Sequence, residues 1–258
     1  MLNRIYNIEC SIHTNRKMGK RKNNYGVDNN NPIYSLLDPE NCALVMIDFQ
    51  PQMAFATKSI DGQMLINNAV GLAKSAKIFG IPTIFTTIGE KRFAGPMFPQ
   101  ITRMFPGQQM IDRTTMNCWE DDRVVSAFKN TGRKKLVLAG LWTEVCIAMP
   151  AIQAIEEGYE VYIVADACGG TTTMAHGMAM ERMIQAGAVP ITWLSFLLEL
   201  QRDWARLETY EAVTSLAMED AGTYGMGIQY AKAMLGENYA ETAIAAEEEI
   251  RKEGRKTI

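Results

Sequence analysis

A chain of 258 residues, with 47% hydrophobic and 21% charged residues, has the composition of a soluble globular protein that can bury one α/β core. A formal net charge of −3 does not favour binding to nucleic acid or an anionic membrane, and no apolar run approaches the roughly 20 residues of a transmembrane helix. The 5 cysteines include no CxxC pair, which favours a reducing, cytoplasmic location. The two histidines, His13 and His176, are too few for a zinc site of several histidines.

The first 32 residues differ from the rest of the chain. They are polar, basic and rich in asparagine, and they contain no apolar segment of the length found in signal peptides. We interpret residues 1–32 as a flexible extension, with Met18 as an alternative start and a transit peptide as the less favoured interpretation. Residues 33–206 are then expected to form the catalytic domain, and residues 207–258 a charged, helical C-terminal tail.

From Cys42 onward, apolar segments alternate with segments of helical periodicity. Strands are expected at 42–49, 81–87, 109–113, 134–141, 160–166 and 189–195. Helices are expected at 64–80, 120–132, 143–158 and 173–187, and a long loop at 90–108. This alternation predicts an α/β fold, a doubly wound and mainly parallel sheet with helices on both faces, followed by C-terminal helices.

Three polar or reactive side chains follow three of these strands. Asp48 ends the first strand, Arg113 ends the third, and Cys146 begins the helix that follows residues 134–141. Because ligands bind at the carboxyl ends of parallel strands, we expect these three side chains to meet at one edge of the sheet.

Cys146 is expected in the first turn of a helix that Thr143 caps. Unpaired N–H groups and the helix dipole favour a thiolate there, and a nearby Arg113 acts in the same direction. Asp48 is the available base, because a guanidinium stays protonated. Position alone nevertheless favours a structural thiol, since most free cysteines are small buried hydrophobic residues.

Three segments carry a family resemblance: ALVMIDFQ, IDRTTMNCWEDD and LAGLWTEVCIAMPAIQAIEEGYEVYIVADACG. They resemble the signature segments of the isochorismatase-like cysteine hydrolases, in particular the YcaC-related subgroup, and the likeness extends from about Pro39 to Trp204. The resemblance implies the isochorismatase-like fold, a ring-like homo-oligomer, and a catalytic triad in which Cys146 is the nucleophile and Asp48 the general base. Arg113 occupies the position at which most of the superfamily has a lysine.

The resemblance also implies a cis peptide bond between Leu141 and Trp142, and an oxyanion hole formed by the backbone N–H groups of Trp142 and Cys146. Nicotinamidases of this superfamily bind a metal through an Asp-x-His pair, whereas here Phe49 and Gln50 follow Asp48. We therefore expect no metal and no cofactor.

The expected reaction is hydrolysis of the C–N bond in a small-molecule amide or imide through a thioester. Because Arg113 replaces a lysine, a catalytically silent oligomer of the same fold remains the alternative. A nucleotide-binding protein is a third interpretation, although no dinucleotide fingerprint is found.

Several further residues are weaker candidates for the substrate pocket. Asn117 follows Arg113 closely and is expected either to shape the site or to fix the loop. The aromatic candidates, each of which is equally well explained as buried core, are Phe49, Phe93, Phe98, Trp119 and Trp142.

Overall fold

The computed structural model describes residues 36–236, 245–246, 249–250 and 252–253. The predicted extension at 1–32 lies outside these residues, as does most of the predicted tail beyond Gly236. The description below concerns the unit that begins at Leu36.

Six parallel strands form one sheet in the order β3-β2-β1-β4-β5-β6. They are β1 (Cys42–Ile47), β2 (Thr83–Ile88), β3 (Met110–Arg113), β4 (Lys135–Leu141), β5 (Glu160–Gly169) and β6 (Val189–Ile191). The chain winds from β1 outward to β3 and then returns to β4 on the other side of β1, so the strand order reverses between β1 and β4. This arrangement confirms the predicted doubly wound α/β fold.

The two central strands, β1 and β4, are buried along their whole length, which explains their continuous apolar sequences. They also approach each other closely at Gly140, which pairs with Ile47 and has a φ of +151°. A Cβ atom at Gly140 would lie 1.9 Å from the carbonyl oxygen of Ile47. Only glycine therefore permits this contact between the strands that carry Asp48 and Cys146.

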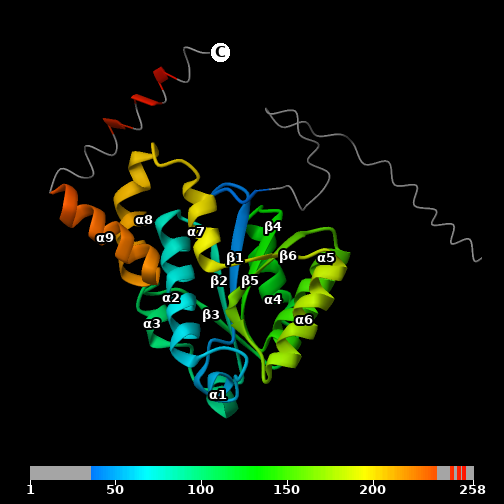
Figure 1. Cartoon of the computed structure of the whole chain (residues 1–258). Coiled ribbons are helices and arrows are strands. Elements are labelled where there is room, and N and C mark those ends of the chain that lie inside the picture. Colours follow the sequence, from blue (N-terminus) through cyan, green and yellow to red (C-terminus); the bar gives the residue numbers. More distant parts are fainter. Residues whose placement is uncertain (1–35, 237–244, 247–248, 251, 254–258) are drawn as a thin grey trace, which may run out of the picture. The chain divides into compact units, whose positions relative to one another are not determined.

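Helices cover both faces of the sheet (Figure 1). One face packs against α2 (Gly62–Ile78) and α7 (Trp193–Gln201), and the other against α4 (Asp122–Asn130), α5 (Ala148–Glu156) and α6 (Thr173–Ala186). The remaining elements are short and lie in loops: α1 (Pro51–Phe55), α3 (Pro99–Thr102), the 3₁₀ turn η3 (Cys118–Glu120) and the π-helical turns η2 (Glu90–Ala94) and η4 (Thr143–Ile147).

Two predicted segments differ in the structure. The sequence predicts a strand over 189–195, but only Val189–Ile191 joins the sheet, because Thr192 and Ser195 form a capping box that starts α7 at Trp193. The predicted long loop at 90–108 contains η2 and α3. Pro99 begins α3, at a helix position where its missing N–H is not needed.

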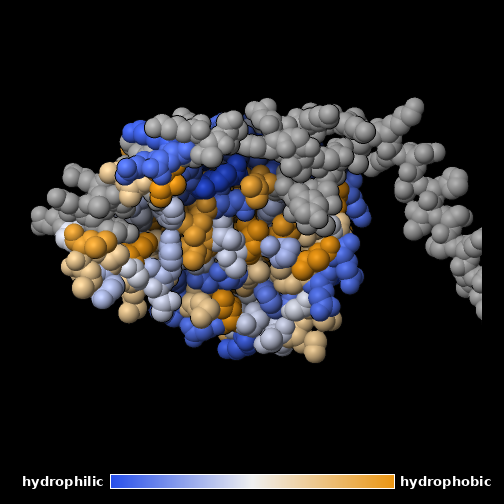
Figure 2. Space-filling view, turned by 45° about the horizontal axis from the view of Figure 1, so that its top comes forward, coloured by the Kyte–Doolittle hydropathy of each residue, from blue (hydrophilic) through white to orange (hydrophobic). Residues whose placement is uncertain are grey.

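The predicted C-terminal helices are α8 (Leu207–Asp220) and α9 (Gly222–Leu235). Helix α8 buries Val213 and Leu216 and packs on α2, and α9 packs on α8. Hydrophobic and hydrophilic residues are interspersed on the face of the molecule seen in Figure 2. Within the part of the chain that the structure describes, no helix is long and apolar enough to span a membrane.

Candidate active site

Asp48 lies immediately after β1, at the carboxyl end of the central strand. Its φ of +55° is in the left-handed region, which residues other than glycine seldom adopt. Its backbone N–H donates to the carbonyl oxygen of Thr86 in β2 at 2.9 Å. The residue is completely buried, so its carboxyl group depends on protein partners rather than on solvent.

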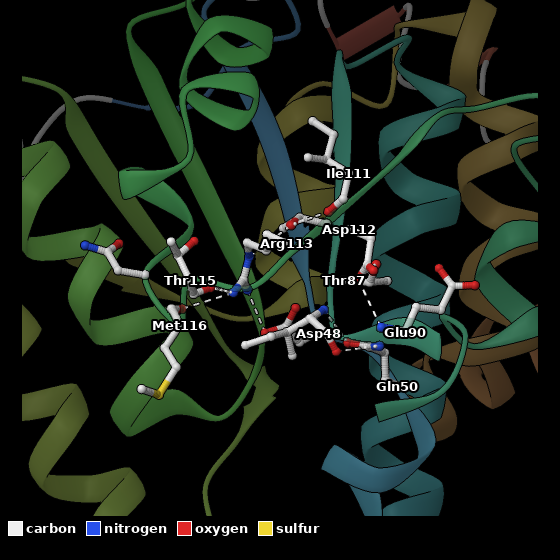
Figure 3. Close-up of polar contacts among 12 residues, drawn as sticks. Asp48, Gln50, Thr87, Glu90, Ile111, Asp112, Arg113, Thr115 and Met116 are labelled. Carbon is white, nitrogen blue, oxygen red and sulfur yellow. Dashed lines mark hydrogen bonds and ion pairs between the residues drawn. The ribbon is translucent and has the colours of Figure 1, made fainter. Parts of the chain in front are cut away.

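Arg113, the last residue of β3, supplies the charge opposite Asp48. Its Nη2 lies 2.6 Å from Oδ2 of Asp48, and both side chains are fully buried. Its Nε donates to Oγ1 of Thr86 at 3.1 Å, and its Nη1 donates to the carbonyl oxygens of Thr115 and Met116. Figure 3 shows these contacts around the guanidinium. Every nitrogen of Arg113 is therefore engaged within the protein.

Cys146 lies in η4, between the end of β4 and the start of α5. Its thiol lies close enough to Asp48 and Arg113 for their charges to act on it in opposite directions. Since β1 and β4 are neighbours, Asp48 and Cys146 stand on the two sides of the reversal in strand order. The structure thus brings Asp48, Arg113 and Cys146 together at one edge of the sheet.

The ionisation of the site follows from burial and from these contacts. Burial raises the pKa of Asp48 to about 6, although the charge of Arg113 opposes the change. Burial and the neighbouring Asp48 carboxylate raise the pKa of the Cys146 thiol to about 12, again against Arg113. Burial also disfavours the charge on Arg113, but Asp48, Cys118 and Cys146 together outweigh that effect and raise the pKa of Arg113. At neutral pH the resting site holds a carboxylate, a guanidinium and a neutral thiol.

The prediction of a stabilised thiolate in a helix capped by Thr143 is therefore wrong. Cys146 lies in a π-helical turn whose N-cap residue is Trp142, and no side chain caps it. The hydroxyl of Thr143 instead lies 2.8 Å from Nδ1 of His176. The sequence could not reveal how deeply the thiol is buried, and here burial beside Asp48 outweighs the favourable backbone N–H groups.

A cavity of about 300 Å³ lies beside Cys146. Its lining consists of Met53, Ile88, Gly89, Phe93, Met116, Trp142, Val145 and Cys146. Phe93 is 64% exposed and Met116 is 59% exposed, so the cavity is open to solvent on their side. Cys146 itself is only 1% exposed, although it belongs to the lining of this cavity.

Trp142 forms part of the cavity wall, and the implied cis peptide bond between Leu141 and Trp142 is present. The indole Nε1 of Trp142 donates to the carbonyl oxygen of Met53 at 2.8 Å. This bond links the turn after β4 to α1, which follows β1. Trp142 and Cys146 both line the cavity.

Gln50 is a buried polar residue whose role the sequence did not indicate. Its Oε1 accepts from the N–H of Ile88 at 2.9 Å, and its Nε2 donates to the carbonyl oxygens of Ile88 at 3.3 Å and Gly95 at 2.5 Å. Gln50 therefore connects the end of β1 to the loop that carries Phe93 (Figure 3). All of these partners are backbone groups, so no pattern of side chains could have predicted the contact.

The remaining pocket candidates lie behind the cavity wall. Phe49 and Phe98 are buried against each other, with 5.9 Å between their ring centroids. The side chain of Asn117 accepts from the N–H of Trp119 at 3.0 Å, and the indole of Trp119 donates to Glu157 at 3.0 Å. Two of the aromatic candidates line the cavity: Phe93 and Trp142.

No arrangement of ligands for a metal is found near the site. Among the residues that the structure describes, no group of three or more His, Cys, Asp and Glu side chains lies close enough to hold an ion. The acidic and basic groups of the site, Asp48 and Arg113, instead compensate each other.

Comparisons with known proteins give a consistent result. A model of the isochorismatase domain matches residues 42–195. The chain is 39% identical over 172 residues to the probable hydrolase YcaC of Escherichia coli, across 66% of this chain and 83% of the relative. The solved structure of that E. coli protein, described as an octameric hydrolase of unknown specificity, has a TM-score of 0.75 at 35% identity, covering 79% of this chain and 98% of the other.

A second solved structure is YcaC from Pseudomonas aeruginosa, with hexane-2,5-diol and covalent acrylamide. It has a TM-score of 0.73 at 34% identity and covers 76% of this chain and 97% of that one. The likeness therefore includes the whole sheet and its surrounding helices, and it extends over nearly all of both relatives.

Proposed function

Because this chain belongs to the isochorismatase family of hydrolases, we propose that it is a cysteine hydrolase that cleaves the C–N bond of a small amide. The observation that carries the proposal is the position of Cys146, beside the Asp48–Arg113 ion pair and on the wall of an open cavity. The octameric state of the E. coli relative supports a homo-oligomer for this chain as well.

The reaction begins with the thiol still protonated. The pKa of Asp48 is about 6 and that of Cys146 about 12, so at neutral pH the carboxylate is formed and the thiolate is not. Asp48 accepts the thiol proton while the sulfur attacks the carbonyl carbon of the amide, which is general-base catalysis of a nucleophilic step. The S–C bond forms, and the carbonyl π electrons move onto oxygen.

The resulting oxyanion is bound by the backbone N–H groups of Trp142 and Cys146. Both residues line the cavity, which supports this assignment. Fixed N–H donors stabilise a developing negative charge without reorganising, and one such donor contributes on the order of 3 kcal/mol in characterised hydrolases.

The tetrahedral intermediate then collapses. Protonated Asp48 gives its proton to the amide nitrogen as the C–N bond breaks, and the amine leaves a thioester on Cys146. The regenerated Asp48 carboxylate takes a proton from water as that water attacks the thioester. The C–S bond then breaks and protonated Asp48 returns its proton to the sulfur, so the products are a carboxylic acid and the free thiol, and the enzyme returns to its starting state.

Arg113 supports Asp48 in this cycle and transfers no proton. Its charge lowers the pKa of Asp48, which would otherwise rise further on burial, and so keeps the base ionised at neutral pH. Its bond to Oδ2 leaves Oδ1 of Asp48 buried without a hydrogen-bond partner among the described residues. Oδ1 is therefore the oxygen available to take the thiol proton.

The covalent acrylamide in the P. aeruginosa relative supports the proposal, because acrylamide is an electrophilic amide that adds to thiols. The test is a screen of small amides with the full chain and with Cys146→Ala, followed by acid quenching and intact mass measurement. We expect wild-type turnover and an acyl adduct on Cys146, and neither in the variant. A folded wild-type protein that hydrolyses no amide and forms no acrylamide adduct at pH 7–8 would instead be a silent oligomer of this fold.

A further inference from the structure

We propose that the substrate has a small, uncharged and apolar acyl group, and that the site discriminates against acyl groups that carry a carboxylate or an ammonium. This inference rests on the proposed function, because it names the substrate class of the same site. It is carried by the chemistry of the cavity wall and by the contacts that engage every nitrogen of Arg113 within the protein.

The cavity wall is apolar wherever a side chain faces it. Among the described residues, the lining contains aliphatic, thioether and aromatic side chains, one glycine and the thiol of Cys146, with no charged residue. The only nitrogen among these side chains is Nε1 of Trp142, and it already donates to the carbonyl oxygen of Met53. No side chain of the wall is thus left to bind a polar substituent of the acyl group.

Arg113 does not provide a binding site for a carboxylate, although it is the closest cation to the nucleophile. It is not part of the lining, its side chain is fully buried, and its nitrogens bind Asp48, Thr86 and two backbone carbonyls. A substrate anion would have to displace Asp48, the base that the reaction needs. The guanidinium is therefore committed to the ion pair.

A charged acyl group would lose its water on entering the cavity and find no opposite charge there. Burial of an unpaired charge is strongly unfavourable, whereas an apolar group gains free energy when it leaves water. The volume of about 300 Å³ is at the lower end of small-molecule sites, so the acyl group must also be small.

A matched pair of thiol reagents tests the charge discrimination without requiring the natural substrate. Iodoacetamide and iodoacetate have nearly the same size and differ in charge. The rate at which each reagent alkylates Cys146 is measured in the full chain by peptide mass mapping. That rate is divided by the rate at which the same reagent alkylates 2-mercaptoethanol, which corrects for the intrinsic reactivity of the reagent. We expect the corrected rate for iodoacetate to be lower by roughly 100-fold, as an uncompensated buried charge requires.

Met116→Lys should reverse part of this discrimination, because Met116 lines the cavity and its exposed side leaves room for the longer cation. The ratio of iodoacetate to iodoacetamide rates should rise by about 10-fold, since a new cation offsets the charge of the reagent. Met116→Gln controls for polarity alone. Met178→Lys adds the same charge at an exposed methionine outside the cavity, 51% exposed on α6, and should leave the ratio unchanged.

Equal corrected rates in the wild type would overturn the inference, as would the same gain in Met178→Lys as in Met116→Lys. Amide hydrolysis separates this inference from the proposed function. Faster hydrolysis of succinamate than of butyramide would contradict the apolar acyl group while leaving the hydrolase intact. Discrimination between the reagents without hydrolysis of any amide would leave the cavity inference standing alone. Failure of both reagents to label Cys146 would overturn both proposals.

Discussion

Nη2 of Arg113 lies 2.6 Å from Oδ2 of Asp48, although Arg113 ends β3, Asp48 follows β1, and β2 lies between these strands. Thr86 of that intervening strand contacts both of them. Its hydroxyl accepts from Nε of Arg113, and its carbonyl oxygen accepts from the N–H of Asp48. The proposed base is therefore fixed by three adjacent strands, which explains how a buried carboxylate keeps one orientation.

The first prediction concerns pH. The pKa of Asp48 is raised from 3.8 to about 6, and the base form is the one required. Alkylation of Cys146 and amide hydrolysis should therefore fall as the pH drops through about 6 and level off above about 7. Asp48→Asn should abolish this fall in rate at low pH and reduce both rates by at least about 100-fold, the typical contribution of a general base. Asp122→Asn, at an exposed carboxylate in the first turn of α4, should retain the fall in rate at low pH.

The second prediction concerns the ion pair. Arg113→Met leaves the Asp48 carboxylate buried without its cation, so it should destabilise the fold by about 3–5 kcal/mol at pH 7.5. The loss should be smaller at pH 5, because Asp48 is then protonated and no unpaired charge remains. Urea denaturation at the two pH values measures the difference. Arg123→Met breaks an exposed pair with Asp121 and should cost less than about 1 kcal/mol.

The third prediction concerns the contact between the central strands. Gly140→Ala places a Cβ atom 1.9 Å from the carbonyl oxygen of Ile47, so β1 and β4 must move apart. We expect a loss of roughly 3 kcal/mol in the free energy of unfolding. Gly177→Ala is the matched control, since a Cβ atom at this position in α6 meets nothing within 4 Å. Because alanine favours helix more than glycine does, this variant should stabilise the fold by up to about 1 kcal/mol. Equal effects of the two variants would contradict this account.

The fourth prediction concerns Gln50. Gln50→Leu removes its bonds to Ile88 and Gly95 and leaves buried backbone groups unpaired. This should lower the free energy of unfolding by about 1–3 kcal/mol. The loop that carries Phe93 should then exchange its amide hydrogens faster, and KM should rise more than kcat falls. Gln108→Leu removes one exposed bond to the carbonyl oxygen of Thr83 and should leave exchange in that loop unchanged. Unchanged exchange in Gln50→Leu would show that Gln50 does not position the loop.

The strands were predictable because a strand buried in a parallel sheet reads as a continuous apolar run, as in Cys42–Ile47 and Lys135–Leu141. Helix α7 was missed for the same reason. Its sequence WLSFLLELQ is apolar at nearly every early position, so it continues the pattern of the strand before it. The capping box that separates the two uses Ser195, where a glutamate or glutamine is the usual signal.

The site was predictable as far as topology determines it. Residues that end parallel strands lie at one edge, and this brings Asp48, Arg113 and Cys146 together whatever the side chains around them. The ionisation of Cys146 was not predictable, because it depends on how deeply the thiol is buried. Thr86 and Gln50 were not predictable either, since Thr86 uses its own carbonyl oxygen as well as its hydroxyl, and the partners of Gln50 are backbone groups.

The reversal in strand order also decides when the reactive centre can exist. Asp48 and Cys146 belong to halves of the domain that wind in opposite directions, and the pairing of β4 with β1 brings them together. A chain still emerging from the ribosome, or one whose two halves have separated, has the carboxylate without an adjacent sulfur. A fall in the rate of Cys146 alkylation as the pH drops through about 6 would therefore belong only to molecules in which both halves are assembled, which makes this pH dependence a reporter of native tertiary structure.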